Sequence, residues 1–355
     1  MARTTTEPPL PDRASSTRPR MRDVASLAQV SLQTVSNVVN GRFDEMSEAT
    51  RERVLEAMDT LGYRTNMAAA SLRSQRVRTI AVLVLDEHAE FLADPLMGLL
   101  IAGVAEVAHD HGYGVLIQGA RPGRRDDAFF RGLREGRADG ALIQLSGAPS
   151  IRREVIDEAR ALGVDLVVID EEDLPSDVMG VRAEQARGMR ELTNHVLGLG
   201  HQRLAFIGAR MPWAVVEQRL AGFQAAIAEA GLVIDADRIL LEAGFEAADG
   251  ERLAARLLGR ADPPTAILCA GDLLAAGAMQ AAKSAGLRVP EDVAITGFED
   301  HPLSAYLDPP LTSVRIPAYE MGRRAASAII ARLAGREAGH PQLVLPTDLV
   351  LRGSA

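Results

Sequence analysis

The chain contains little cysteine, and it lacks long apolar runs. Its 355 residues include one cysteine, Cys269, which excludes an internal disulfide framework and a multi-cysteine zinc site. No apolar run reaches the roughly 18–20 residues of a membrane-spanning helix. The N-terminal stretch also lacks the apolar segment of a secretory signal peptide. These absences predict a cytoplasmic protein that does not contact a membrane.

The motifs of common enzyme and metal sites are missing as well. No GxGxxG follows the first predicted strand, and neither GxxxxGK followed by Ser or Thr nor GxSxG occurs. The seven histidines are scattered without the spacing of a metal site. We therefore expect no catalytic residues, no metal and no cofactor.

Charge is distributed unevenly along the chain. Residues 1–80 carry twelve arginines and nine acidic residues, whereas the remainder carries 27 basic and 39 acidic residues, within a net charge of −9. A weakly basic N-terminal end on an acidic body is the asymmetry expected when only that end meets phosphates.

The chain divides into four regions by pattern. Residues 1–19, rich in Thr, Pro, Ser and Arg, are expected to form a disordered tail. Residues 20–64 read as a three-helix head, and residues 65–78 as a hinge helix and linker. From residue 79 to 355, short apolar runs alternate with amphipathic stretches, which predicts an α/β domain of parallel sheets with helices on both faces.

This α/β region repeats its pattern in two halves, which indicates two doubly wound lobes around a cleft. Ligands of such folds bind at the carboxyl ends of the strands. We assign residues of about 79–180 and 300–315 to lobe one, and about 181–299 and 316–350 to lobe two.

Residues 21–40 carry the pattern of two helices packed across a tight turn. Val24 and Ala28 share one helix face, and Val35 and Val38 share another. Ser31 is a good N-cap for a second helix over 32–39, whose outward side chains are predicted to be Leu32, Gln33, Ser36 and Asn37. A third helix follows, capped by Ser47. Any small helical bundle with a polar face would show the same pattern, so these residues alone leave DNA binding as one of two interpretations.

Longer motifs resemble the lactose-repressor (LacI/GalR) family. They are DVASLAQVSLQTVSNVVN in the head, and LGHQRLAFIG, CAGDLLAAGAMQAAKSAGLRVPEDVAITGFED and PPLTSVRIPAYEMGRRA in the body. The resemblance covers about residues 20–350. It implies a helix-turn-helix head, a hinge helix and a two-lobed effector domain like a periplasmic binding protein.

The resemblance implies that the helix over 32–39 lies in the major groove of operator DNA. Its base-reading residues would be Leu32, Gln33 and Asn37. The phosphate contacts would be Ser31, Thr34, Ser36, Asn40 and Thr50. Gln29 replaces the family's usual glycine, at a turn that commonly needs positive φ.

The hinge admits two interpretations. It could be a plain linker between domains, since a helix this short is unstable alone in water. The resemblance implies instead that it folds on operator DNA and enters the minor groove, with Asn66 as its cap, Ala69 at the helix contact and Leu72 as the wedge.

The resemblance also implies an effector site in the cleft. Its residues would be Leu96, Met97, Glu171, Glu184, Arg219, Phe245, Asp272 and Glu299. Several depart from the family pattern, since Glu299 replaces an aspartate and Gly271 replaces an asparagine. A sugar is the family's usual effector, and the acidic set would also suit a polyol, an amino sugar or a cationic metabolite.

Together these features predict a cytoplasmic, nucleoid-associated transcription repressor. It would bind a palindromic operator as a homodimer under the control of a small molecule held between the lobes. An activator or dual regulator of the same family is the alternative. A periplasmic solute-binding protein would lack the head.

Overall fold

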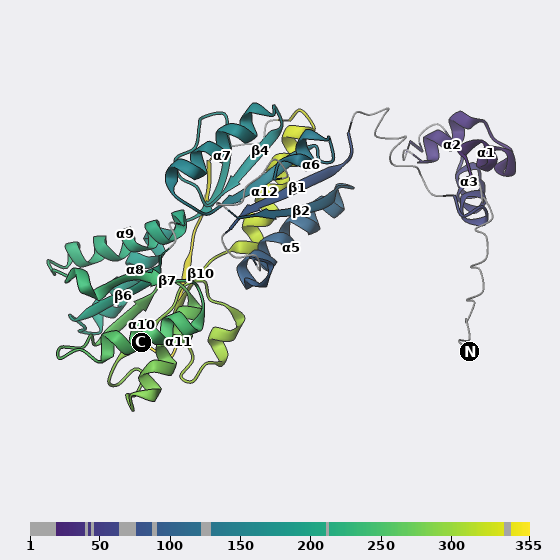
Figure 1. The fold of residues 1–355 in the computed structure, drawn as a ribbon. Coiled ribbons are helices and arrows are strands. Elements are labelled where there is room, and N and C mark those ends of the chain that lie inside the picture. Colours follow the sequence, from purple (N-terminus) through teal and green to yellow (C-terminus); the bar gives the residue numbers. More distant parts are fainter. Residues whose placement is uncertain are drawn as a thin grey trace, which may run out of the picture. The chain divides into compact units, whose positions relative to one another are not determined.

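The computed structural model describes residues 19–39, 42–43, 46–63, 76–86, 91–121, 129–210, 213–336 and 342–355. They belong to two compact units, a small helical unit that ends at Gln75 and a larger α/β unit that begins at Arg76 (Figure 1). Asn40 and the predicted hinge residues Asn66, Ala69 and Leu72 lie outside the described residues, as does nearly all of the predicted tail.

The small unit contains helices α1 (Met21–Ala28), α2 (Leu32–Val39) and α3 (Glu48–Thr60). Val24, Val35 and Val54 are fully buried where the three helices meet. Ser31 Oγ accepts the backbone N–H of Thr34 at 3.0 Å, so its predicted capping role is confirmed. Ser47 caps α3 in the same way.

Gln29 ends α1 in the left-handed region, with φ 51° and ψ 49°. The backbone N–H of Val30 returns to the carbonyl of Ala25 at 3.0 Å and closes the turn. The predicted positive φ at this non-glycine position is confirmed.

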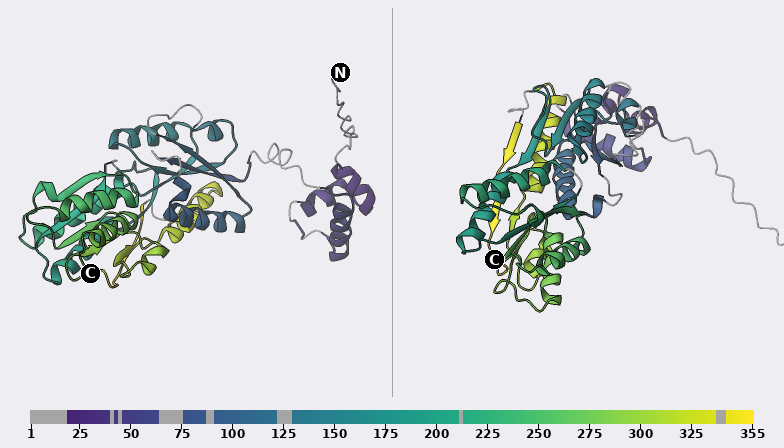
Figure 2. Two further views of the ribbon diagram at one scale, coloured as in Figure 1. Left: turned by 60° about the horizontal axis from the view of Figure 1, so that its bottom comes forward. Right: turned by 60° about the vertical axis from the view of Figure 1, so that its left-hand side comes forward.

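The larger unit has two parallel sheets, each covered by helices on both faces (Figures 1 and 2). The first sheet runs in the order β11-β5-β4-β3-β1-β2. Its strands are β1 (Thr79–Leu85), β2 (Gly114–Ala120), β3 (Gly140–Leu145), β4 (Asp165–Ile169), β5 (Met179–Ala183) and β11 (Gln342–Leu345).

Alternate residues of β1 point to opposite layers, as the two-residue period of a strand requires. Val82 packs in the layer of α5 (Pro95–Asp110) and α12 (Ala318–Leu333). Leu83 packs in the layer of α6 (Arg131–Arg134) and α7 (Pro149–Ala161). A Cβ atom at Gly103 of α5 would collide with the carbonyl oxygen of Tyr319, so this glycine permits the close contact between α5 and α12.

The second sheet runs in the order β7-β6-β8-β9. Its strands are β6 (Leu204–Ala209), β7 (Ile239–Ala243), β8 (Ala266–Cys269) and β9 (Ala294–Thr296). Helices α8 (Gln185–Gly198) and α9 (Ala214–Glu229) share the buried layer of Phe206. Helices α10 (Ala247–Leu258) and α11 (Asp272–Ser284) share that of Ile207. A short antiparallel pair joins β10 (Ser313–Arg315) to β12 (Asp348–Val350).

The segments after residue 300 belong to different lobes than predicted. Strand β11 pairs with β5, and α12 packs on α5, so residues 318–345 belong to lobe one. Residues 300–315 belong to lobe two, because Gly297 donates to the carbonyl of Thr312 at 3.0 Å. The assignment of 300–315 to lobe one is therefore wrong, and so is that of 318–345 to lobe two, whereas β12 pairs with β10 in lobe two. Local periodicity identifies strands but not their partners.

Candidate nucleic-acid interface and ligand cleft

The N-terminal end of α2 presents an exposed polar and apolar surface. Leu32 is 55% exposed, and Gln33 beside it is also exposed. The hydroxyl groups of Ser31 and Thr34 lie 2.9 Å apart at the start of the helix. Side chains at this end of the helix are free to meet a surface, so the geometry is compatible with the predicted base and phosphate contacts.

Asn37 lies differently from the prediction. Its side chain is buried, at 7% exposure, and its Oδ1 accepts a hydrogen bond from Gln33 Nε2 at 2.9 Å. The prediction that Asn37 points outward is wrong. Its short side chain stays close to its own helix, where Gln33, one turn earlier, donates a hydrogen bond to it. Ser36 is half-buried on the same helix. Thr50 is half-buried at the start of α3, with its hydroxyl 2.9 Å from that of Ser47.

A cavity of about 530 Å³ opens between the lobes of the larger unit. Its lining follows the carboxyl ends of strands from both sheets: Asp86 follows β1, Asp170 follows β4, Trp213 follows β6 and Phe245 follows β7. Clefts in doubly wound folds bind ligands at this edge, and this volume is typical of small-molecule sites.

The cavity collects five of the eight predicted effector residues: Leu96, Met97, Arg219, Phe245 and Glu299. It also contains Gln185, which the resemblance places at the cleft beside Glu184. Its other polar residues were not predicted as effector contacts, namely Asp86, Asp94, Arg121, Gln144, Asp170, Glu246 and His301. Asp94 could have been suspected from the sequence, because it lies two residues before Leu96, a predicted effector residue.

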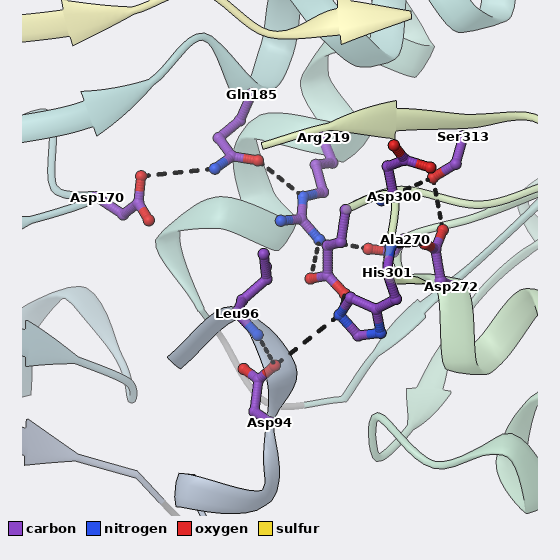
Figure 3. A network of polar contacts seen from close by, with 11 residues as sticks. Asp94, Leu96, Asp170, Gln185, Arg219, Ala270, Asp272, Asp300, His301 and Ser313 are labelled. Carbon is purple, nitrogen blue, oxygen red and sulfur yellow. Dashed lines mark hydrogen bonds and ion pairs between the residues drawn. The ribbon is translucent and has the colours of Figure 1, made fainter. Parts of the chain in front are cut away.

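Arg219 is held by protein groups at two of its three nitrogen atoms (Figure 3). Its Nε donates to Gln185 Oε1 at 2.9 Å, and its Nη1 donates to the carbonyl of Ala270 and to Glu299 Oε1 at 3.0 Å. Its guanidinium lies 4.3 Å from the centre of the Phe298 ring. Arg219 is 2% exposed, and these contacts fix its orientation in the cavity wall. No hydrogen bond joins its Nη2 to the residues that the structure describes, so the arginine keeps donors for a ligand.

Glu299 connects Arg219 to His301. Burial opposes ionisation of Glu299, but the charges of Arg219 and His301 outweigh it and hold the pKa of Glu299 below its usual range. Burial likewise opposes the charged form of His301, whereas the Glu299 carboxylate 3.3 Å away raises the pKa of His301. Glu299 has φ 108° and the following Asp300 has φ 53°, so this loop is held in a strained conformation next to the cavity.

Asp272 lies behind the cavity wall and does not line it. Its carboxylate accepts the backbone N–H of His301 and the hydroxyl groups of Ser304 and Ser313, each at 2.6 Å. Burial raises its pKa to about 6 even though the two hydroxyl groups oppose this shift. Asp272 therefore holds the His301 loop in place, and the prediction that it contacts the ligand directly is not supported.

Glu171 and Glu184 also lie outside the cavity lining. Glu171 Oε2 accepts from Arg152 Nε at 2.7 Å, and the pair is buried. Glu184 Oε2 accepts from Arg187 Nη1 at 2.6 Å, one helical turn along α8. Both carboxylates have arginine partners outside the cavity lining.

An aromatic pair forms one wall of the cavity. The rings of Trp213 and Phe245 lie 4.8 Å apart at 74°. A Cβ atom at Gly271 would lie 2.7 Å from Phe245 Cε1, so the glycine that replaces the expected asparagine makes room for this ring. Trp213 was not predicted as a site residue. It is the only tryptophan of the chain, and this was the signal in the sequence that could have drawn attention to it.

The described residues show neither a membrane span nor a metal site. No helix among them is long and apolar enough to span a bilayer. Within the same residues, no three His, Cys, Asp or Glu side chains are grouped so as to hold a metal ion.

Two family models match the chain. The model of bacterial regulatory proteins of the lacI family matches residues 20–66, and that of the periplasmic binding protein-like domain matches residues 193–355. The regulator CelR of Thermobifida fusca is 31% identical over 95% of this chain and 98% of its own length. The repressor CytR of Escherichia coli K12 is 31% identical over 94% of this chain and 95% of its own. Both relatives are regulators and not enzymes.

Solved structures agree in fold with the whole chain. The Lac repressor dimer bound to operator and an anti-inducer has a TM-score of 0.82 at 27% identity, covering 95% of this chain and 99% of that one. A CelR–cellobiose complex has a TM-score of 0.69 at 30% identity, covering 95% and 100%. The head, the two lobes and the near full-length similarity establish that the chain belongs to the LacI family of transcriptional regulators.

Proposed function

We propose that the protein is a transcription repressor that binds a palindromic operator as a homodimer and responds to a small molecule in the cleft. One observation supports this best: a helix-turn-helix head with an exposed recognition helix and a two-lobed cleft occur in one chain. In this proposal the head spans residues 20–64 and the hinge residues 65–78. The protein acts in the cytoplasm, at the nucleoid.

In this proposal Leu32 and Gln33 read bases. Glutamine can bond both N6 and N7 of adenine, and leucine can pack on a thymine methyl. Ser31, Thr34, Ser36 and Thr50 would position the head on phosphates, as would Asn40. Asn37 would then support Gln33 through its hydrogen bond instead of reading a base itself.

The effector in this proposal is a sugar or a sugar-like molecule. The apolar wall of Leu96, Met97 and Phe245 suits the face of a ring, and the carboxylates of the cavity disfavour an anion. Binding would shift the population between lobe arrangements, which in turn changes the spacing of the two heads on DNA.

The test begins with selection of bound sequences from random DNA by the full-length protein, followed by affinity measurements at fixed salt. We expect Gln33→Ala to weaken binding to the selected operator by about 5- to 150-fold, the value of one good base contact. Thr60→Ala, a charge-neutral change at the exposed far end of α3, serves as the control and should bind as the wild type does. Absence of any sequence preference at every salt concentration would refute the proposal.

Repression itself is tested with a reporter gene whose promoter overlaps the selected operator. Expression should fall when the protein is present and recover in the Gln33→Ala variant. A rise in expression would instead identify an activator.

A further inference from the structure

Acidic side chains outnumber basic ones in the lining of the cavity. The lining includes five acidic residues, namely Asp86, Asp94, Asp170, Glu246 and Glu299, and three basic ones, namely Arg121, Arg219 and His301. With all of these groups ionised, the lining carries two more negative than positive charges. A cavity with this balance attracts cations and repels anions.

The excess of negative charge lies on the wall that lobe one forms. Lobe two contributes two groups of each sign, namely Arg219, His301, Glu246 and Glu299. Lobe one contributes three carboxylates and one arginine, which form the lobe-one wall, namely Asp86, Asp94, Asp170 and Arg121. Three of these residues directly follow β1, β2 and β4, and Asp94 caps α5, so they gather at the carboxyl edge of the first sheet. A cation in the cavity is therefore drawn to the lobe-one wall.

The hydrogen bonds to two of these carboxylates come from neutral groups (Figure 3). Asp94 Oδ1 accepts the backbone N–H of Leu96 at 2.9 Å. Asp170 Oδ1 accepts the backbone N–H of Ala183 at 3.2 Å and Gln185 Nε2 at 3.5 Å. Burial raises the pKa of Asp94 to about 6 and also raises the pKa of Asp170. The neutral donors therefore do not offset the burial of these two carboxylates, whereas a positively charged donor would.

A molecule in the cavity can reach Asp94. The side chain of Asp94 is 50% exposed, and the residue lines the cavity. His301 Nε2 of lobe two lies 3.9 Å from Asp94 Oδ1, beyond the range of a direct hydrogen bond. The carboxylate of Asp94 can therefore accept a further donor.

The rest of the lining suits the carbon skeleton of a small ring. Leu96 and Met97 are apolar, and the rings of Trp213 and Phe245 lie 4.8 Å apart at 74°. Aromatic rings pack on apolar faces and also attract cations. Within the described residues, no three His, Cys, Asp or Glu side chains are grouped so as to hold a metal ion, so the carboxylates favour an organic cation.

We propose that the effector is an amino sugar whose protonated amino group faces Asp94 and Asp170 on the lobe-one wall. An ammonium group only donates hydrogen bonds, and ionised carboxylates only accept them. Hydrogen bonds between two charged partners are also stronger than those between neutral ones. A neutral sugar would leave the excess charge uncompensated, and a sugar phosphate would add to it. This inference rests on the proposed function of the cleft and narrows its effector class.

The first test compares amino sugars with matched neutral sugars, using the full-length protein at pH 7. Glucosamine, galactosamine and mannosamine are each measured against the parent sugar and the N-acetylated sugar. Trp213 lines the cavity and is the only tryptophan, so its fluorescence reports occupancy. We expect at least one amino sugar to bind about 10-fold or more tightly than both of its neutral counterparts, as for a hydrogen bond to a charged group. Failure of all three amino sugars to bind, or no preference for any of them over its neutral counterparts, would overturn the assignment.

The second test removes charge from the lobe-one wall with Asp94→Asn and Asp170→Asn. Asparagine keeps an oxygen that can accept the same backbone N–H groups, and it tolerates the φ of 56° at residue 170. At least one variant should lower the preference for the amino sugar over its parent sugar by about 10-fold. A merely structural defect would weaken both sugars alike and leave the preference unchanged, so an unchanged preference in both variants would contradict the proposal.

Asp110→Asn is the matched control, because Asp110 is exposed at the other end of α5. It removes the same charge from the same helix and should leave both affinities as in the wild type. Operator binding measured without sugar tests the proposed function separately. A protein that binds its operator and responds only to a neutral sugar would keep that function and refute the amino-sugar assignment.

Discussion

One ion pair outside the effector cavity connects the two lobes. Removing it tests how the protein is distributed between different arrangements of the lobes. Arg152 of α7 is held in lobe one, where Nη1 donates to the Gly147 carbonyl and Nε to Glu171 Oε2, both at 2.7 Å. Its Nη2 reaches Glu217 Oε2 of α9, in lobe two, at 3.3 Å. Glu217→Gln should therefore shift the population away from the arrangement seen in the structure.

The size of the shift follows from the exposure of the two partners. The Arg152 side chain is 5% exposed, but that of Glu217 is 46% exposed, so solvent screens the pair. Exposed ion pairs contribute about 0.2–1 kcal/mol. Because Arg152 is already immobilised by lobe one, we expect a value in the upper half of this range, about a three- to fivefold change in the population ratio. In this variant Arg152 still forms its ion pair with Glu171, so no buried charge is left without a partner.

Trp213 fluorescence and the radius of gyration from small-angle scattering measure this shift in the effector-free protein. Glu229→Gln is the matched control, since Glu229 is also on α9 and lies 3.3 Å from Arg190, but within one lobe. The difference between wild type and Glu217→Gln should shrink at 1 M salt, where the screening length is about 3 Å. An equal response of the Glu229→Gln control, or a shift that salt does not reduce, would contradict the reasoning.

Three further predictions concern stability and reactivity. Gln29→Gly should relieve the left-handed strain by up to about 1 kcal/mol. It should slow hydrogen exchange of the α1 and α2 amides, and faster exchange would show that the turn is not strained. Asp272→Ala should lower the free energy of unfolding by at least about 1–3 kcal/mol, because it leaves the backbone N–H of His301 unpaired; an unchanged urea midpoint would exclude that role. Burial, followed by the charge of Asp272, raises the pKa of Cys269, and its side chain is fully buried. A thiol reagent should therefore label Cys269 only after unfolding, and rapid labelling of the native protein would contradict its placement.

The sequence predicts the local features of the head well. The apolar spacing of Val24 and Val35, the caps at Ser31 and Ser47 and the positive φ of Gln29 all depend on neighbours within a few residues. The burial of Asn37 was not predicted. It depends on how the helices pack and on whether the Asn37 side chain bonds to Gln33 or to solvent.

In the larger unit, the apolar runs predict the buried strands but not their pairing. Strands β5 and β7 were not predicted from the apolar runs. The lobe assignment of residues 300–315 and 318–345 was reversed, because it depends on contacts between residues far apart in the chain.

For the cleft, too, the sequence predicts some of the lining residues and misses others that depend on contacts between distant segments. Arg219 and Phe245 line the cavity, and the resemblance had aligned both with a binding site. Glu171 lies outside the lining and pairs with Arg152, a contact between different elements that spacing in the sequence does not reveal. His301 was missed because its place at the cavity, 3.9 Å from Asp94 of the other lobe, depends on a contact between residues far apart in the chain.

The exchange of segments between the lobes also constrains how the protein can be assembled. Residues 342–345 complete the edge of the lobe-one sheet, and Ser354 a few residues later donates its hydroxyl to the Ile295 carbonyl of lobe two. Neither lobe can be completed during synthesis until this last stretch has been made, whereas the head needs only residues that emerge first. A premature stop codon late in the reading frame would thus leave a nascent DNA-binding head attached to two unfinished lobes.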